Sequence, residues 1–555
     1  NYAIADQLSL LAKLMDIHGE NAFKAKSYAS AAFAIEKLPT PLVEMAEAKI
    51  FQVRGIGESV GKKVIEILQT GELKALQELL QNTPEGVLEM MQIKGLGPKK
   101  INIIWKEMGI DSLPELERAC RENRVAAKKG FGEKTEQKIL ESIEFTKSNS
   151  GKFLYKQMED FALAMQKKLE EQFPQEQFAL TGEFRRQMDV ISQLEWVTTA
   201  SKEVLKNYLL NDESVLLFDK EDVLVIKAGD QVELVFHLAT QETFSQILFQ
   251  TSSSQDFLTA WKNAGFSVNS ESEEAIFQQA GLSYIPPFLR ESGLSIEKAK
   301  TENFSNLVHP STIKGLIHSH SNWSDGAYDI EEMAENLMDS GFEYMVISDH
   351  SKAAFYANGL TEQRIKEQHK YIDALNKKLA PFKIFKSIEC DILSDGTLDY
   401  DNKTLASFDL VITSVHSNLD MEEDKAMMRL MGAITNPYTT ILGHMTGRIL
   451  LRRKGYPVDH KAIIKACAEH NVVIEVNSSP SRMDIDWRWI QYAVEQGVLL
   501  SINPDAHTLD DFQYIKYGTL VAQKGGLPTA RNLSSFSLKE FENFLTETRR
   551  KKGIL

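Results

Sequence analysis

The stretch that decides the fold is IHSHSNWSDG, residues 317–326. It ends a strand-like apolar run with two histidines one residue apart and continues into a turn that carries Asp325. Side chains alternate along an extended strand, so His318 and His320 are predicted to point to the same side. Mixed imidazole and carboxylate ligands suit Zn, Mn or Fe better than Mg or Ca. The stretch therefore predicts one corner of a transition-metal site.

Further strand ends of the same kind follow through the last 240 or so residues. The strand-like runs YMVISDH, LVITSVH, NVVIEVN and VLLSINPDAH alternate with helical patterns such as DIEEMAENLMDS and HKAIIKACAEH. This alternation predicts βα units in a barrel or parallel sheet. In a βα barrel, residues just past the strand ends face the active-site mouth. The candidate ligands at six such ends are His318, His320, Asp325, His350, Glu389, His416, His444, Asp505 and His507.

Nine of the twelve histidines lie beyond residue 315. A lone histidine is more often a hydrogen-bonded core or surface residue than a ligand, and His369, His460 and His470 lie within helical patterns, so they are taken as ordinary residues. Six separate strand ends that all carry His, Asp or Glu favour a metal site for the remainder.

The first 150 residues are predicted to be all helical, because apolar residues recur at spacings of three and four. Three turns interrupt this pattern, each followed by lysines and a helical segment: Gly55-Ile56-Gly57, Gly95-Leu96-Gly97 and Gly130-Phe131-Gly132. Backbone N–H groups at such a helix start bind phosphate without reading bases. The predicted DNA-binding residues are Gly55, Gly57, Lys62, Lys63, Gly95, Gly97, Lys99 and Lys100. The third turn fits either a DNA contact or a purely structural turn.

Between these regions, VLLF, DVLVIKA and QVELVFHL predict strands separated by turns. The aliphatic-poor tract after Pro286-Pro287 is the best linker candidate. The predicted domains are two helical ones at 1–80 and 81–150, an α+β pair at 151–240 and 241–290, a linker at 291–314 and a metal-binding domain at 315–555.

Composition limits the class of protein. A chain of 555 residues is too long for one core, and its net charge of −15 argues against a uniformly basic nucleic-acid coat while allowing local basic patches. Three scattered cysteines fit a reducing cytoplasm. There is no apolar run of about 18 residues and no secretion signal, so we expect no membrane partner. A cytoplasmic monomer is the simplest prediction.

The motifs IHSHSNWSDG, ISDH, SIECD, SVHS, GHMTGR and NPDAH resemble those of the PHP (polymerase and histidinol phosphatase) domain, and Met445 alone departs, standing where that domain has proline. The resemblance implies a distorted (β/α)7 barrel, nine ligands, two to three divalent ions (Mn or Zn, or Fe) and phosphoester hydrolysis. Arg448 is a candidate catalytic residue that holds phosphate. The run 452–454 fits either a phosphate contact or a solvated basic turn.

The glycine turns, with ENAFKAKSYASAAFAIEKL before them and GLSYIPPFLRE later, resemble the lyase, fingers and thumb parts of family X DNA polymerases. The whole chain thus resembles the bacterial fusion of a polymerase X core to a PHP domain. In that family a lysine after the first turn can form a Schiff base, and Lys63 matches its position. A phosphate contact or a solvated lysine is the alternative for Lys63.

The palm motif of that family is only partly present. Gly182, Phe184 and the pair Arg185-Arg186 match, and the two arginines are expected to keep a fold or DNA-contact role. The changed positions are Glu183 for a phosphate-binding serine, Gln193 and Glu195 for the paired aspartates, and Glu233 for the third. Two-metal transfer needs about three carboxylates, whereas glutamine supplies no charge and glutamate reaches one methylene too far. The polymerase site is therefore predicted to be degenerate.

These features predict a DNA-processing phosphoesterase, a 3′-5′ exonuclease or 3′-end-cleaning enzyme that acts on gapped, nicked or 3′-ended DNA in the bacterial nucleoid. One alternative is an active gap-filling polymerase with a PHP exonuclease. Another is a non-catalytic scaffold that binds DNA ends and uses its metals structurally. A small-molecule phosphatase fits less well, because it leaves the N-terminal half without a purpose.

Overall fold

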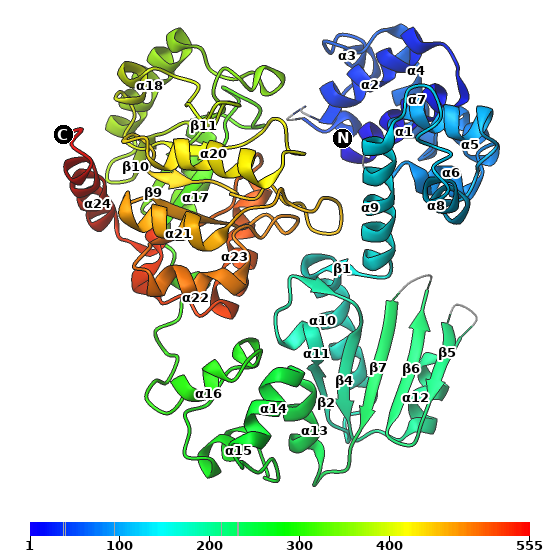
Figure 1. The fold of residues 1–555 in the computed structure, drawn as a ribbon, viewed down its shortest axis with the longest axis vertical. Coiled ribbons are helices and arrows are strands. Elements are labelled where there is room, and N and C mark those ends of the chain that lie inside the picture. The colour runs from blue at the N-terminus through cyan, green and yellow to red at the C-terminus, as the bar shows by residue number, and fades with distance from the viewer. Residues whose placement is uncertain (37, 39, 94, 212–213, 230–231) are drawn as a thin grey trace. The chain divides into compact units, whose positions relative to one another are not determined.

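The computed structural model describes residues 1–36, 38, 40–93, 95–211, 214–229 and 232–555. The chain forms two compact units, residues 1–150 and 151–555 (Figure 1). The first is helical, and the second combines a mixed sheet with a barrel of parallel strands. The predicted multidomain fold class is confirmed. Within the described residues, no helix combines the length and apolar character needed to cross a bilayer.

The helical unit buries one apolar core, which includes Leu8, Leu14 and Tyr28. The predicted segment ENAFKAKSYASAAFAIEKL contains α2, and its residue 37 lies outside the described part of the chain. The helices are α1 (Tyr2–His18), α2 (Ala22–Glu36), α3 (Glu47–Ile50), α4 (Glu58–Thr70), α5 (Lys74–Gln81), α6 (Glu85–Met90), α7 (Pro98–Asn102), α8 (Leu113–Arg121) and α9 (Glu133–Asn149).

The first glycine of each of the three turns has a left-handed backbone. Gly55, Gly95 and Gly130 have φ angles of +95°, +87° and +94°, a region that side chains with a Cβ rarely adopt. The second glycine of each turn directly precedes α4, α7 or α9. The third turn, left open between a structural and a DNA-contact role, shares this first glycine but differs at its second, because Gly132 has a φ of 173° where Gly57 has −79° and Gly97 has −74°.

The mixed sheet of the second unit has the strand order β2-β4-β7-β6-β5, with β4 and β7 parallel. Alternate residues of the central strands, including Trp196 and Phe236, form its core. The predicted run QVELVFHL contains β7, which begins at Val232, and its first residue lies outside the described part of the chain. The elements are β1 (Phe153–Leu154), α10 (Tyr155–Gln172), β2 (Phe178–Thr181), α11 (Gly182–Arg185), β3 (Val190–Ile191), β4 (Leu194–Thr198), α12 (Lys202–Leu209), β5 (Ser214–Asp219), β6 (Val223–Ala228) and β7 (Val232–Leu238).

A small helical part follows, made of α13 (Phe244–Thr251), α14 (Gln255–Asn263) and α15 (Glu273–Gln279) around an aromatic core. The segment 291–314, predicted as a linker, is not an extended tether. It contains α16 (Leu294–Lys298), and its residues Ile296, Ala299 and Phe304 join that aromatic core. The few apolar residues of this tract are spaced so that they are buried in one cluster. The low aliphatic content of the tract therefore did not predict its packing.

The barrel begins at β8 (Gly315–Ser319) and contains parallel strands only, among the residues described. Strands β10 and β11 are separated by two residues and pair with β9 and β12 respectively, so together they act as one strand and the barrel has seven. The backbone N–H of His320 donates to the Ala506 carbonyl oxygen (2.8 Å) and closes it. The other strands are β9 (Tyr344–Ile347), β10 (Lys383–Lys386), β11 (Glu389–Asp391), β12 (Ile412–Ser414), β13 (Ile441–Leu442), β14 (Val473–Asn477) and β15 (Leu500–Asn503).

Alternation along the strands separates an outer apolar layer from the barrel interior. In β14, Ile474 and Val476 pack toward the helices, while Val473 joins the inner cluster. That inner cluster includes Phe541 of the C-terminal helix α24, so apolar side chains fill one end of the barrel. The helices are α17 (Ile330–Asp339), α18 (Glu362–Lys378), α19 (Asn402–Leu405), α20 (Glu423–Ile434), α21 (His460–Glu469), α22 (Trp487–Glu495), α23 (Ile515–Lys524) and α24 (Leu538–Lys551).

Candidate metal centre

The barrel brings the nine candidate ligands together at the carboxyl ends of its strands. Eight of them fall into three overlapping groups whose ligand atoms lie within 4.8 Å of one another. The ninth, His444, places Nε2 3.0 Å from Oε1 of Glu389. The groups are His320, Asp325, His350 and His507; His318, His320, Glu389 and Asp505; and His350, Glu389 and His416.

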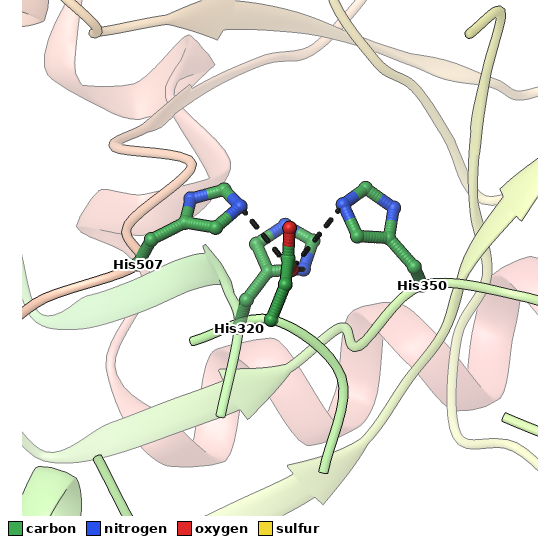
Figure 2. A group of neighbouring side chains, drawn as sticks. His320, His350 and His507 are labelled. Carbon is green, nitrogen blue, oxygen red and sulfur yellow. Dashed lines mark ion pairs between the residues drawn. The ribbon is translucent and has the colours of Figure 1, made fainter. Parts of the chain in front are cut away.

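Residues shared between the groups link them into one centre. His320 belongs to two groups, with Nε2 3.1 Å from Oδ1 of Asp505 and Nδ1 4.0 Å from Oδ1 of Asp325. Glu389 also belongs to two, with Oε1 3.4 Å from Nε2 of His318 and Oε2 3.0 Å from Nδ1 of His350. Figure 2 shows His320, His350 and His507 converging from three different parts of the barrel. Shared ligands of this kind are what a multinuclear site requires.

The two histidines of the opening motif reach the centre by a route that simple alternation does not describe. His318 has a φ of +66°, and the pairing of β8 with β9 slips by one residue between Leu316 and Ser319. This irregularity, and not an extended strand, turns both imidazoles inward. Asp505 also has a left-handed backbone, with φ of +54°. Such conformations in residues other than glycine concentrate at functional sites.

Asp325 is positioned by a turn that only glycine can complete. A Cβ on Gly326 would lie 2.1 Å from the carbonyl oxygen of His320. The Gly326 N–H donates to the Ser321 carbonyl (2.9 Å) and folds the turn back toward the strand. The carboxylate of Asp325 thereby comes within 3.5 Å of Nε2 of His507 and 3.6 Å of Nε2 of His350.

Two further carboxylates hold the imidazoles in place, and neither was predicted. Oε1 of Glu475 lies 2.6 Å from Nδ1 of His318, and Oδ1 of Asp391 lies 3.0 Å from Nδ1 of His416. Each leaves the opposite ring nitrogen turned toward the centre, an arrangement usual around protein-bound metals. The signal was present in the sequence, because Glu475 sits in an otherwise apolar strand run and Asp391 ends SIECD.

Several buried polar atoms of the centre make no hydrogen bond within the described part of the chain. They are Nε2 of His318, Nδ1 of His320, Nδ1 of His350, Oε2 of Glu389 and Nδ1 of His444. Buried polar atoms are nearly always satisfied, so a cluster of exceptions calls for a ligand. Nitrogen and carboxylate donors in this number fit Mn, Zn or Fe, and the donor set passes this test for a metal site.

The pKa shifts in the centre differ in direction: His320 and Glu389 shift toward the form that binds a cation, whereas nearby carboxylates outweigh burial and raise the pKa of His318, His350 and His416. Burial, together with two neighbouring histidines, lowers the pKa of His320 to about 3, so its imidazole is neutral. Burial acts to raise the pKa of Glu389, but the surrounding histidines, His416 foremost, hold it well below its usual value. A neutral imidazole and an ionised carboxylate are the protonation states that ligate a metal.

The structure does not bring Arg448 into this cluster. Its guanidinium contacts Oδ2 of Asp486 (2.5 Å), Oδ2 of Asp189 (3.5 Å) and two main-chain carbonyls. Arg448 therefore joins the barrel to the mixed sheet, in place of the predicted phosphate-binding role. Arg482, which the sequence did not single out, lies closer to the centre, with Nε 3.8 Å from Oδ2 of Asp505.

Comparison with protein families matches three parts of the chain. The helix-hairpin-helix domain family matches residues 1–73, and the SAM-like helix-hairpin-helix tandem family matches residues 87–144. The PHP domain family matches residues 317–479, which include most of the candidate ligands.

Relatives cover the chain more completely. The DNA polymerase/3′-5′ exonuclease PolX of Bacillus subtilis (strain 168) is 35% identical over an alignment of 565 positions, which covers 97% of this chain and 98% of that protein. The chain belongs to the PolX family. The predicted fusion of a polymerase X core to a PHP domain is thus confirmed.

Two further relatives match only part of this PolX family member. A probable phosphatase of Thermoanaerobacter sp. (strain X514) is 26% identical over 247 residues, 42% of this chain and 96% of the phosphatase. DNA polymerase lambda of Rattus norvegicus is 32% identical over 117 residues, 21% of this chain and 19% of the polymerase.

In this PolX family chain, two of the four changed palm positions, Glu183 and Glu195, contact other side chains. Oε2 of Glu195 lies 2.8 Å from Nε2 of His237, and a Cβ on Gly182 would overlap the Glu195 carboxylate. Glu183 accepts hydrogen bonds from the N–H and hydroxyl of Ser192 (2.6 and 2.7 Å). Gln193 is half-buried, as is Glu233 on β7. Among the residues described, all candidate metal groups lie in the barrel.

The two palm arginines contact the small helical part. Arg185 reaches Oγ of Ser252 (2.7 Å) and Oε2 of Glu273 (2.5 Å). Arg186 donates through Nε to Oε1 of Glu291 (3.0 Å). These contacts give both arginines a role in the fold.

The predicted DNA-binding lysines lie along α4 and α7 of the helical unit. Lys62 pairs with Glu58 (2.7 Å) in an exposed position, and Lys63 pairs with Glu66 (3.0 Å) in a half-buried one. Lys99 is exposed, and Nζ of Lys100 lies 3.3 Å from the Gly95 carbonyl oxygen. Surface pairs of this kind are weak, so a phosphate can displace them.

Proposed function

We propose that this chain is a metal-dependent phosphoesterase that acts on the 3′ ends of DNA, as a 3′-5′ exonuclease or an end-cleaning enzyme. The observation that carries the proposal is the buried centre in which His320 and Glu389 each join two groups of potential ligands. The exonuclease in the printed name of the Bacillus subtilis relative supports DNA as the substrate. The helix-hairpin-helix matches support DNA as a binding partner.

We propose two to three divalent ions, Mn or Zn, held by the nine residues predicted from the sequence. When bound, the ions would lower the pKa of a water and polarise the phosphate. The surrounding protein residues hold the ligand side chains in position. Glu475 and Asp391 fix the ring orientation of His318 and His416. Arg482, beside Asp505, is placed to hold a non-bridging phosphate oxygen.

In the other half, nucleotidyl transfer is proposed to be weak or absent. Glu195 is paired with His237, and Gln193 carries no charge, so three free carboxylates do not meet on this sheet face. The palm and the helical unit then serve to bind DNA and deliver its end. Preference for gapped or nicked DNA, a monomeric state and a place in the nucleoid stay predictions, as does a lyase role for Lys63.

A strand-polarity assay tests the proposal. Single-stranded DNA labelled at either end is incubated with Mn and the full chain. We expect 5′-labelled DNA to shorten progressively and 3′-labelled DNA to release short labelled products at once. His320→Ala should abolish both, while His470→Ala, at the end of α21, should behave as wild type. Intact DNA with the wild-type chain, or equal activity of His320→Ala, would overturn the proposal.

A further inference from the structure

A loop that follows the candidate ligand His350 carries two exposed aromatic side chains. Phe355 is 85% exposed and Tyr356 is 52% exposed, whereas Ala354 and Ala357 on either side are fully buried. The buried alanines anchor the turn and force the two rings outward. Single exposed apolar residues are common on protein surfaces, but two adjacent exposed rings beside a candidate site form a small apolar surface that suits a bound ligand.

Three hydrogen bonds fix this loop, residues 351–360, to the metal centre. The Leu360 N–H donates to the carbonyl of His350 (2.9 Å), which closes the loop at its base. The Asn358 amide donates to the carbonyl of Ser324 (3.3 Å), the neighbour of Asp325. The hydroxyl of Ser351 accepts from the Asp391 N–H (3.0 Å). The loop is therefore tied to three segments that build the centre, and its tip is held in place.

The tip also lies within the electrostatic field of the centre. Burial and the carboxylates of Asp391, Glu389 and Asp325 raise the pKa of Tyr356 to about 12, while Arg482 opposes them. These are the acidic groups at the mouth and the arginine beside Asp505. Tyr356, one of the two residues of the tip, is therefore close enough to the centre for its charged groups to act on the phenol.

The two rings are arranged so that a face stays open. Their centroids are 5.9 Å apart and their planes meet at 77°, so they touch edge to face and are not stacked on each other. A nucleobase has a flat π-face, and its stacking on an aromatic side chain tolerates any base identity. Bases inside a duplex are already stacked on their neighbours, whereas bases at an unpaired end are available.

We propose that Phe355 and Tyr356 form a stacking platform for the bases of an unpaired DNA 3′ end whose terminal phosphodiester lies at the metal centre. This rests on the proposed function, because it assigns that centre its substrate end. The platform makes the enzyme prefer single-stranded and frayed ends over blunt duplex ends. Arg482 would hold the phosphate while the aromatic tip holds the base.

The test compares Phe355→Ala/Tyr356→Ala with wild type on two single-stranded DNAs, one ordinary and one with abasic sugars at its last two 3′ positions. We expect KM for ordinary DNA to rise by about 5- to 100-fold, with kcat within about twofold. KM for the abasic DNA should be high already and change little. Phe161→Ala, an exposed aromatic on α10, is the matched control and should leave both values unchanged.

A binding readout separates this proposal from the activity. DNA with 2-aminopurine at its 3′ end is added to folded His320→Ala protein, and stacking should quench its fluorescence. Quenching that is lost when Phe355→Ala and Tyr356→Ala are added supports the platform. If the wild-type chain hydrolyses no DNA but this loss of quenching is seen, the proposed function fails and the platform stands. Unchanged quenching or unchanged KM in the double variant, or an equal loss on both DNAs, would overturn the platform.

Discussion

Nζ of Lys524 lies 2.6 Å from Oε1 of Glu291 and 2.9 Å from the main-chain oxygen of Arg186. Lys524 is the last residue of α23 in the barrel. Glu291 lies in the tract after the small helical part, and Arg186 lies in the palm motif. Glu291 also binds the guanidinium of Arg186. An arginine from the polymerase motif is thus part of a buried contact with the phosphoesterase barrel.

This contact predicts a pH-dependent stability. Burial lowers the pKa of Lys524 to about 8, against the pull of Glu291, while an unfolded lysine titrates near 10.4. Between these values the unfolded chain holds more protons, so stability rises with pH, and below about pH 8 the cost of the buried charge is fully present. Relative to Lys524→Met, the free energy of unfolding of the wild type should rise by about 3 kcal/mol between about pH 8 and about pH 10.5.

Urea unfolding of both proteins across that range measures the difference. Lys551→Met, exposed on α24, is the control and should show no such trend. A wild-type advantage that stays constant with pH would contradict a buried, titrating Lys524.

Glu475 is predicted to set metal affinity without being a ligand. Its carboxylate holds Nδ1 of His318 and accepts the His444 N–H (2.7 Å), so Glu475→Gln should weaken the hold on both. We expect metal affinity to fall about 10- to 100-fold. Competition with a chelating dye checks this, with Glu469→Gln on the surface of α21 as the control. Equal affinity in Glu475→Gln would remove this role.

How far the sequence could predict the centre depends on the kind of residue. The nine candidates could be predicted to meet because most of them lie at or shortly after a strand end, where the barrel fold itself directs side chains to the mouth. Glu475 and Asp391 were missed because they act through other residues, and strand-end spacing does not mark that. Arg448 was predicted to bind phosphate because it lies in the GHMTGR motif. Its actual partners, Asp486 and Asp189, are far from it in sequence, so the pairing could not be predicted.

The fold, like the metal centre, could be predicted only in part from the sequence. Periodicity was enough to predict the helical unit and the alternating barrel, since both depend on local pattern. The inward turn of His318 depends on a slip in strand pairing, which a single strand does not encode. The packed tract after residue 290 depends on partners such as Phe249 and Trp261 more than 30 residues away.

The palm is predicted not to support nucleotide incorporation. On DNA with a one-nucleotide gap, in a His320→Ala background that removes degradation, labelled deoxynucleotide should not be added above the level without protein. The physical reason is that Glu195 is already paired with His237 and Gln193 cannot bridge metal ions. Incorporation that is lost in Glu233→Ala would show instead that this palm remains a polymerase site.

The helical unit is predicted to hold DNA through phosphates. Replacing exposed Lys99 by alanine should weaken binding to gapped DNA regardless of its sequence. It should also reduce the slope of log affinity against log salt by about one, as expected for one lost phosphate contact. Fluorescence anisotropy at several salt concentrations measures the slope, and Lys366→Ala on α18 is the control. An unchanged slope would place Lys99 outside the DNA contact.

The most direct measurement follows bound metal and nuclease rate together. Protein freed of metal by a chelator is titrated with Mn. The number of ions bound per chain and the rate of nucleotide release from DNA 3′ ends are measured in the same samples. We predict that the rate rises with occupancy and saturates at about two to three ions per chain. Full occupancy with a stable fold and no turnover on any DNA would contradict a catalytic centre and leave a scaffold with structural metals.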